Sequence, residues 1–301
     1  MQDYEKKFEL INYRESNLLI KAMNPKLSPL AQRIIALTVL LTNKNQLAHK
    51  GIEIPTADLK KLLGLPHNYP NLNGLLNDVF KSELKEAIMI SDDGKPISEN
   101  DPHLEERSYT VFMGWFTQYS YRNGSFSFKI APDLAKIYLN YKSNFTVFNL
   151  AIDNCLGKNK YANRLFRYIK KEAFKFESKQ EEWEWRFRVD DLKTIFGIDE
   201  NKYTVFADFK RKVLIPAIKS INTYTDYIIS FNSEFLGKVI GNIVFTIRKK
   251  NKEEEEQMWN ELRKDADIEE ITLTLAKLEK LNNAQIINSD TIQIIEDKRE
   301  E

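Results

Sequence analysis

The residues best suited to do chemistry form a basic cluster on one face of a helix predicted over residues 203–222. At about 100° per residue, Phe206, Phe209, Val213, Ala217 and Ile221 fall on one side of this helix. The opposite side carries Thr204, Asp208, Arg211, Lys212, Ile215, Lys219 and Asn222. Guanidinium and ammonium groups beside short polar side chains are typical of surfaces that bind duplex DNA. An ordinary solvated helix face is the alternative interpretation.

Each outward residue of this helix has a chemical role in a DNA complex. Arg211 can donate two parallel hydrogen bonds to guanine O6 and N7. Asp208 can accept from cytosine N4 or can orient Arg211, and Ile215 can meet a thymine methyl group. The phosphate-binding candidates are Lys202, Lys210, Lys212 and Lys219. Tyr203 and Thr204, at the helix start, are further candidate DNA contacts. Pro216 predicts a kink that leaves residues 203–214 as the straight reading segment.

Further basic residues flank this helix in the sequence. Lys160 and Arg164 start an earlier helical run, and Arg186 and Arg188 alternate with aromatic residues on a predicted strand. Lys238 lies at the tip of a predicted hairpin. All five are candidate phosphate contacts.

The elements that position these residues occur twice. "ADLKKLLGL" at residues 57–65 returns as "DDLKTIFGI" at residues 190–198. Each copy is predicted to lie in the order helix, strand, short helix, glycine-bearing turn, longer helix and β-hairpin, with Thr56 and Asp190 as N-caps of the short helices. Two helices joined by a tight turn and closed by a hairpin make a winged helix. The sequence therefore predicts a helix-rich α+β fold with tandem winged-helix domains, the alternative being two unrelated α+β domains with a chance match.

The first copy is chemically different from the second. Its longer helix, over residues 72–85, presents Asn73, Asn77, Asp78 and Lys81 outward, with little positive charge. The acidic loop that follows, over residues 92–107, would repel phosphate. We therefore expect weaker DNA contact from the first domain. The aromatic strands over residues 111–121 are either a protein interface or part of the domain core.

Charge divides the chain into three parts. Residues 141–250 hold 21 Lys and Arg against 13 Asp and Glu, whereas residues 251–301 hold 7 against 15. We predict a first domain over 14–140, a basic second domain over 141–250 and an acidic, partly helical tail over 251–301. The fold is expected to be complete by Lys250. A basic domain favours a polyanionic partner.

Other classes of function lack their usual residues. The three histidines, at positions 49, 67 and 103, have no paired ligand spacing, and no glycine-rich phosphate loop occurs, so we expect no metal or cofactor. Cys155 lies on an apolar helical face and is interpreted as core packing. No apolar run approaches the length of a membrane span, and no signal peptide is recognised, so a cytoplasmic, non-enzymatic protein is expected.

Four stretches also carry a family resemblance. They are "SNLLIKAMNPKLSPLAQRIIAL", "FTVFNLAIDNCLGKNKYANRLFRYIK", "VDDLKTIFGI" and "KYTVFADFKRKVLIPAIKSIN". Together they resemble the replication initiators of iteron-containing, theta-replicating plasmids over about residues 14–250. The recognition helix of that family corresponds to Tyr203–Asn222 in this sequence.

The resemblance implies a fold, a function and a set of partners. Two winged helices related by a pseudo-twofold axis would bind direct repeats, the iterons, in origin DNA, open the origin and recruit the host helicase. Monomers would act at iterons. Dimers joined through the first domain would bind an operator inverted repeat, repress the initiator gene and so contribute to copy control. The implied host partners are the chromosomal replication initiator, the replicative helicase and chaperones.

Two alternatives remain at this stage. A dedicated winged-helix transcriptional repressor would bind an inverted repeat only as a dimer. A nicking replication enzyme would use a tyrosine, although the clustered histidines that such enzymes use to hold a metal do not occur.

Overall fold

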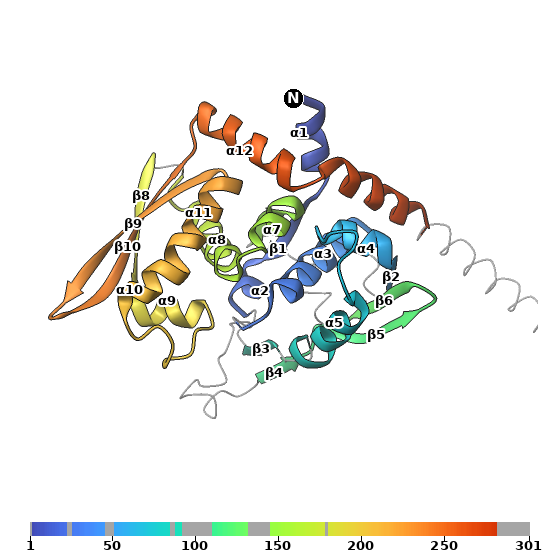
Figure 1. Cartoon of the computed structure of the whole chain (residues 1–301), viewed down its shortest axis with the longest axis horizontal. Coiled ribbons are helices and arrows are strands. Elements are labelled where there is room, and N and C mark those ends of the chain that lie inside the picture. Colours follow the sequence, from blue (N-terminus) through green and yellow to red (C-terminus); the bar gives the residue numbers. More distant parts are fainter. Residues whose placement is uncertain are drawn as a thin grey trace, which may run out of the picture.

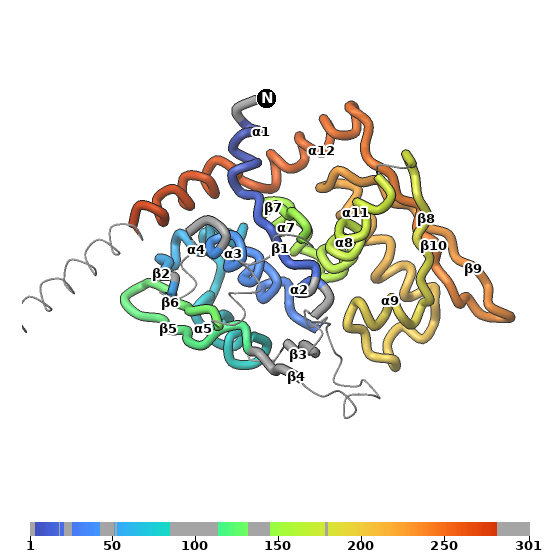
Figure 2. Tube along the Cα trace, turned by 180° about the vertical axis from the view of Figure 1, so that it is seen from behind, coloured from blue at the N-terminus to red at the C-terminus, as the bar shows by residue number. Residues whose placement is uncertain are grey.

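The computed structural model describes residues 2–22, 26–45, 51–84, 88–91, 110–131, 145–177 and 180–281. Figures 1 and 2 show two α+β units side by side, with α7 and α8 between them and a pair of C-terminal helices along one edge. The predicted acidic loop and the end of the tail lie outside the described residues.

The N-terminal part contains the first winged helix. Its elements are α1 (Gln2–Glu9), β1 (Asn12–Ser16), α2 (Asn17–Ala22), α3 (Pro29–Asn45), β2 (Ile52–Pro55), α4 (Thr56–Leu62), α5 (Leu72–Asp78), a π-helical turn (Val79–Glu83), β3 (Ile88–Ser91), β4 (Thr110–Met113), β5 (Phe116–Arg122) and β6 (Ser125–Ile130). Ser28 caps α3, since its Oγ accepts from the Ala31 N–H at 3.2 Å.

The second part repeats this plan. Its elements are β7 (Phe145–Asn149), α7 (Leu150–Leu156), α8 (Lys160–Ala173), β8 (Glu182–Arg188), α9 (Val189–Ile195), α10 (Phe206–Phe209), a π-helical turn (Lys210–Leu214), α11 (Ile215–Tyr224), β9 (Tyr227–Leu236), β10 (Val239–Lys249) and α12 (Lys252–Asp265). The two winged-helix sheets have equivalent antiparallel strand orders, β2-β6-β5 and β8-β10-β9. The predicted tandem winged-helix fold is confirmed.

The repeated sequence phrase adopts the same backbone conformation in both copies. Gly64 and Gly197 have φ of 60° and 63°, in the left-handed region where glycine carries no Cβ penalty. The following N–H groups close the helix end, because Leu65 donates to Lys60 O and Ile198 to Lys193 O, both at 2.9 Å. These are Schellman C-caps, and they set the turn between the two helices of each motif.

Three local predictions were wrong. The second copy was predicted to begin with a helix, but residues 145–149 form a strand, because β7 pairs antiparallel with β1 from Asn12 to Ser16. Pro55 and Arg188, not Thr56 and Asp190, occupy the N-cap positions of α4 and α9. The Thr56 hydroxyl instead donates to Gly124 O in the hairpin turn at 2.8 Å.

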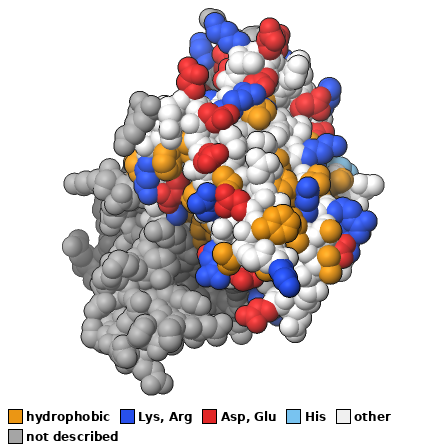
Figure 3. Space-filling model, turned by 90° about the vertical axis from the view of Figure 1, so that its left-hand side faces the viewer, with side chains coloured by type: hydrophobic (Ala, Val, Ile, Leu, Met, Phe, Trp, Pro, Cys, Tyr) orange, Lys and Arg blue, Asp and Glu red, His pale blue; other side chains and the backbone are white. Residues whose placement is uncertain are grey.

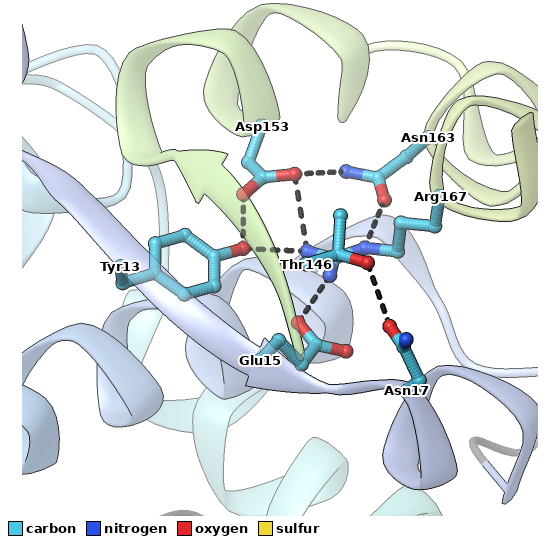
Figure 4. A network of polar contacts seen from close by, with 7 residues as sticks. All are labelled: Tyr13, Glu15, Asn17, Thr146, Asp153, Asn163 and Arg167. Carbon is cyan, nitrogen blue, oxygen red and sulfur yellow. Dashed lines mark hydrogen bonds and ion pairs between the residues drawn. The ribbon is translucent and has the colours of Figure 1, made fainter. Parts of the chain in front are cut away.

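A buried polar network joins the N-terminal strand to the helices between the domains (Figure 4). Arg167 of α8 pairs with Glu15 of β1 and, at 3.1 Å, with Asp153 of α7. Its Nη2 donates to the Tyr13 hydroxyl at 2.7 Å, and its Nε donates to Asn163 Oδ1 at 2.7 Å. Burial lowers the pKa of Arg167, but the two carboxylates outweigh that effect and hold the guanidinium charged.

This network lies in a layer shared by both domains. Helix α7 packs against α3 on one side and against α11 on the other, while α8 packs against α11. Cys155 is buried in α7, where burial raises the pKa of its thiol to about 12, which confirms its assignment to the core. The two winged helices therefore share a hydrophobic core and are not connected by a linker alone.

The expectation that the fold is complete by Lys250 was wrong. Asn251 caps α12 with a capping box, and a further helix covers residues 268–281. Both helices bury apolar side chains in the main core: Met258, Leu262, Ile268, Ile271, Leu275 and Leu278. Trp259 also meets Tyr4 and Phe8 of α1 edge-on, at centroid distances of 5.9 and 4.7 Å. We call residues 252–281 the C-terminal strap, because they run from the second domain across to the first (Figure 1).

Within the residues that the structure describes, none of the helices has the length and apolar character needed to cross a bilayer.

Candidate nucleic-acid interface

The predicted reading helix exists, but it begins later and is less regular than the sequence suggested. It starts at Phe206 with Val205 as N-cap, so Tyr203 and Thr204 lie in the preceding turn. Residues 210–214 form a π-helical turn in which the Ile215 N–H donates to Lys210 O. Pro216, which has no N–H, follows directly, and the wider turn accommodates that missing donor. The expected straight segment over residues 203–214 is therefore wrong.

The two faces of this helix separate as predicted. Phe209, Val213, Ala217 and Ile221 are fully buried. On the opposite side Arg211, Lys212, Ile215 and Lys219 are exposed, and Thr204 in the preceding turn and Lys210 are exposed as well. Burial of one stripe fixes the rotation of the helix and leaves the cationic stripe in solvent.

Arg211 is more exposed than its neighbour Lys212, with 74% of its side chain exposed against 51%. Its Nη2 donates to Asp208 Oδ1 at 2.9 Å, and the Lys212 ammonium approaches the same oxygen at 3.4 Å. The hydrogen bond from Arg211, together with the Lys212 charge, lowers the pKa of Asp208. Asp208 therefore stays ionised and orients Arg211, one of the two roles considered for it.

The neighbouring candidates differ in how freely they project. The Lys210 ammonium lies 5.6 Å from the Phe231 ring centroid, which ties this exposed side chain to the hairpin. The Lys202 Nζ lies 3.7 Å from Asp199 Oδ2, and the other oxygen of the same carboxylate, Oδ1, pairs with Lys26 Nζ of the first domain at 3.1 Å. Lys160 and Tyr203 are half-buried, and Tyr203 has φ of 51°.

The burial of Arg164 contradicts its predicted role in DNA binding. Only 4% of this residue is exposed, and its Nε donates to Ile195 O at 2.9 Å. It therefore connects α8 to the end of α9 inside the domain. Its predicted contact with DNA phosphate is wrong, because the side chain is buried. The helical pattern of the sequence did not show that this turn of α8 faces the core.

The candidates on the sheet lie on its outer side. Arg186 and Arg188 are exposed, and Arg186 Nη2 donates to Glu234 Oε1 of β9 at 2.9 Å. Lys238 follows Gly237 at the tip of the β9–β10 hairpin. Figure 3 views the end of the molecule formed by the second domain, where basic, acidic and apolar side chains are interspersed.

The first domain offers a sparser surface. Along α5 and the π-helical turn after it, Asn73 and Asn77 are half-buried and Lys81 is exposed. The Tyr119 hydroxyl donates weakly to Asn77 Oδ1 at 3.4 Å. Weaker DNA contact from the first domain stays a prediction.

Sequence reasoning missed one part of the surface. A groove runs between the start of the reading helix and the tip of the hairpin. It is lined by Arg188, Val189, Asp190, Lys193, Tyr203, Thr204, Phe206, Phe235, Leu236 and residues 238–241. Three apolar side chains at the tip, Phe235, Leu236 and Val239, are exposed. Apolar residues directly flanking a Gly-Lys turn were the available signal, since hairpin tips are usually polar.

Comparison with known proteins agrees with this architecture. Residues 12–170 match the family described as "Initiator Replication protein, WH1", and residues 188–247 match "Initiator Rep protein, WH2". A search of curated protein sequences finds no match. The fold is similar to that of the Pi initiator protein, whose crystal structure was determined in complex with iteron DNA. The TM-score is 0.60 and the identity 20%, over 80% of this chain and 98% of that one. Since the first family match alone spans more than half of its residues, the chain belongs to the initiator replication protein family.

Proposed function

We propose that this chain initiates plasmid replication by binding direct repeats in origin DNA, with the 206–224 helix in a major groove. The observation that carries the proposal is the exposed cationic stripe of that helix, with Arg211 held by Asp208 at its centre. A second helix that follows a tight turn and precedes a hairpin is the element that winged helices place in the major groove. Family membership and the likeness to an iteron-bound initiator support the same function.

The protein acts in this proposal by binding and not by catalysis. Occupied repeats strain a neighbouring A·T-rich segment until it opens, and the assembly recruits the host replication initiator and helicase in the cytoplasm. The first domain makes a secondary DNA contact and joins two chains into a dimer. The dimer binds an operator inverted repeat and represses the gene, and host chaperones are further partners of the protein.

Selection from a random duplex library, followed by binding to the enriched sequence, tests the DNA-reading helix. Arg211→Ala should weaken specific binding by about 1–3 kcal/mol and relax the preference at one base pair. Arg263→Ala, which removes a cation from α12 remote from this surface, is the matched control and should leave both unchanged. An unaltered base preference in the Arg211 variant contradicts the assigned role.

Assays on origin DNA separate the proposed function from its alternatives. Tandem repeats should be bound by the monomer, and a plasmid carrying them should replicate when the protein is supplied. Binding to an inverted repeat alone, without replication, identifies a dedicated repressor. A covalent tyrosine adduct on supercoiled DNA with Mg²⁺ identifies a nicking enzyme.

A further inference from the structure

A pocket of about 620 Å³ lies where the C-terminal strap passes the first domain. Residues of α3, α4, the end of α7 and the strap line it, and none of them belongs to the groove at the proposed DNA interface. Its walls are partly apolar, through Leu30, Leu65, Tyr69 and Ile271. Pockets that bind small molecules have about this size and combine apolar walls with a few polar groups.

The charged side chains of this pocket leave one positive charge in excess. They are four cations, Arg33, Lys60, Lys61 and Lys158, and three carboxylates, Asp265, Asp267 and Glu270. Lys61 pairs with Glu270 at 2.8 Å and Lys158 with Asp265 at 3.0 Å. Lys60 is half-exposed and donates to His67 O at 2.8 Å, which leaves the charge of Arg33 to be explained.

Arg33 is a buried cation that has no carboxylate partner among the described residues. Only 8% of the residue is exposed, and its Nη1 donates to Leu63 O at 3.0 Å. Its Nε has no hydrogen-bond partner, and neither has Oδ1 of Asn154, a second lining residue that is 5% exposed. Burial lowers the pKa of Arg33. Because a buried guanidinium without a negative partner is unfavourable, a bound anion would stabilise this site.

The backbone beside Arg33 makes room for its guanidinium. A Cβ at Gly157 would lie 2.4 Å from Arg33 Nε and 2.9 Å from Asp153 O. The absence of a side chain at this position, the C-cap of α7, therefore lets the guanidinium lie against the end of the helix. A larger residue would displace Arg33 from its place in the lining.

We propose that this pocket binds a small organic monoanion, whose carboxylate or phosphodiester group pairs with Arg33 while its ring lies against Tyr69 and Leu65. A guanidinium recognises both groups, because its planar N–H groups match the geometry of two oxygens. One negative charge also balances the lining, whereas a dianion would exceed it. The bound molecule would contact the first domain and the strap at once. This inference does not depend on the proposed function, since it involves no DNA.

The test titrates the full chain with two aromatic monoanions and their uncharged analogues. Cyclic AMP carries a phosphodiester that adenosine lacks, and indole-3-acetate carries a carboxylate that is replaced by an amide in indole-3-acetamide. At least one anion should bind with a Kd below about 1 mM in calorimetry, and the midpoint of thermal unfolding should rise with its concentration. The anion that binds identifies the recognised group. Its uncharged analogue should bind about tenfold more weakly or not at all.

Two variants locate the binding in this pocket. Arg33→Lys keeps the charge but loses the planar guanidinium, and it should weaken binding by about tenfold or more. Ala57→Phe fills the pocket from an exposed position on α4, so it should abolish binding and leave the circular dichroism spectrum unaltered. Ala276→Phe, at an exposed position of the strap outside the lining, is the matched control and should bind as the wild type does.

Three results would overturn the assignment. They are binding of neither anion at millimolar concentration, equal binding of the uncharged analogues, and wild-type affinity in the Ala57→Phe variant. Each of them leaves the proposed function untouched, because selection of a duplex by the wild-type chain is measured separately.

Discussion

The two winged helices share a backbone and differ in what their surfaces can bind. Both have the same strand order, the same Schellman turn after the first helix and a π-helical turn within the second. On the second helix, however, the first domain exposes Lys81, whereas the second domain exposes Lys210, Arg211, Lys212 and Lys219. A duplicated fold therefore supplies two equivalent platforms, and the side chains decide which of them is suited to DNA.

The first helices of the two motifs differ in a second way. In the first domain α4 is engaged by the C-terminal strap, through Lys277 to Asp58 at 2.7 Å and Lys61 to Glu270 at 2.8 Å. Lys60 donates to His67 O at 2.8 Å. The basic groups of α4 are thus occupied within the molecule, whereas α9 borders the groove at the proposed interface. The C-terminal strap therefore covers α4 in the first domain, whereas the equivalent helix α9 of the second domain borders an open groove.

The two domains are joined by one shared core, and replacing Arg167 should destabilise that core more than any other change considered below. Arg167→Met leaves Glu15 and Asp153 buried without their counter-charge. The free energy of unfolding should fall by about 3–5 kcal/mol, measured by urea denaturation.

A combined variant controls for lost packing at this site. Adding Glu15→Gln and Asp153→Asn to Arg167→Met removes the uncompensated charges and should recover a substantial part of the stability. A loss below about 1 kcal/mol in the single variant would mean that the network does not hold the junction.

The C-terminal strap gives the next largest expected effect. Leu262 is fully buried, so Leu262→Ala should lower the free energy of unfolding by about 2–5 kcal/mol, measured by thermal or chemical unfolding. Leu273, which is 65% exposed on the 268–281 helix, is the matched control, and Leu273→Ala should change stability by less than about 0.5 kcal/mol. Equal small losses would show that the strap is dispensable and that the fold is complete at Lys250 after all.

The sequence predicted the elements that depend on short-range signals. The Asp-Leu-Lys phrases with their glycines specify a helix and its C-cap locally, and the periodicity of residues 206–221 separates the buried face from the exposed one. It did not predict the β1–β7 pairing, because Asn12 and Asn149 meet across 137 positions and each strand is only five residues long.

The errors at the candidate site have similar physical causes. Arg164 looked like a surface cation, but its burial depends on α9 carrying a free carbonyl at Ile195, which no local pattern reveals. The tail looked detached because its four consecutive glutamates mark a solvated face. That face belongs to α12, whose other side is apolar and packs on the core.

The equivalence of the two turns can be tested with one pair of substitutions. Gly64→Ala and Gly197→Ala each place a Cβ in the left-handed region, which costs about 1–2 kcal/mol of stability. Gly64→Ala should cost more, since its Cβ would lie 3.0 Å from the Cβ of Asn154, whose amide donates to Leu62 O at 2.9 Å. Gly114→Ala should be close to neutral in the same unfolding measurement, because Gly114 has no positive φ and an added Cβ would meet only Phe116 O, in ordinary contact at 3.9 Å. If either turn tolerates alanine without loss, the two motifs do not share their C-cap.

The smallest expected effect is a change in the salt dependence of DNA binding, and it tests most directly whether the two domains differ in their contact with phosphate. Lys212 and Lys81 are both exposed lysines on the second helix of their motif, so their alanine variants form a matched pair. Binding to phosphate releases counterions, and Lys212→Ala should therefore lower the slope of log K against log salt by about one while weakening all sequences alike. Lys81→Ala should leave the slope nearly unchanged, since we expect weaker contact from the first domain. If both variants lower the slope equally, the first domain lies on the DNA backbone as closely as the second, and the scarcity of charge on its helix does not determine its role.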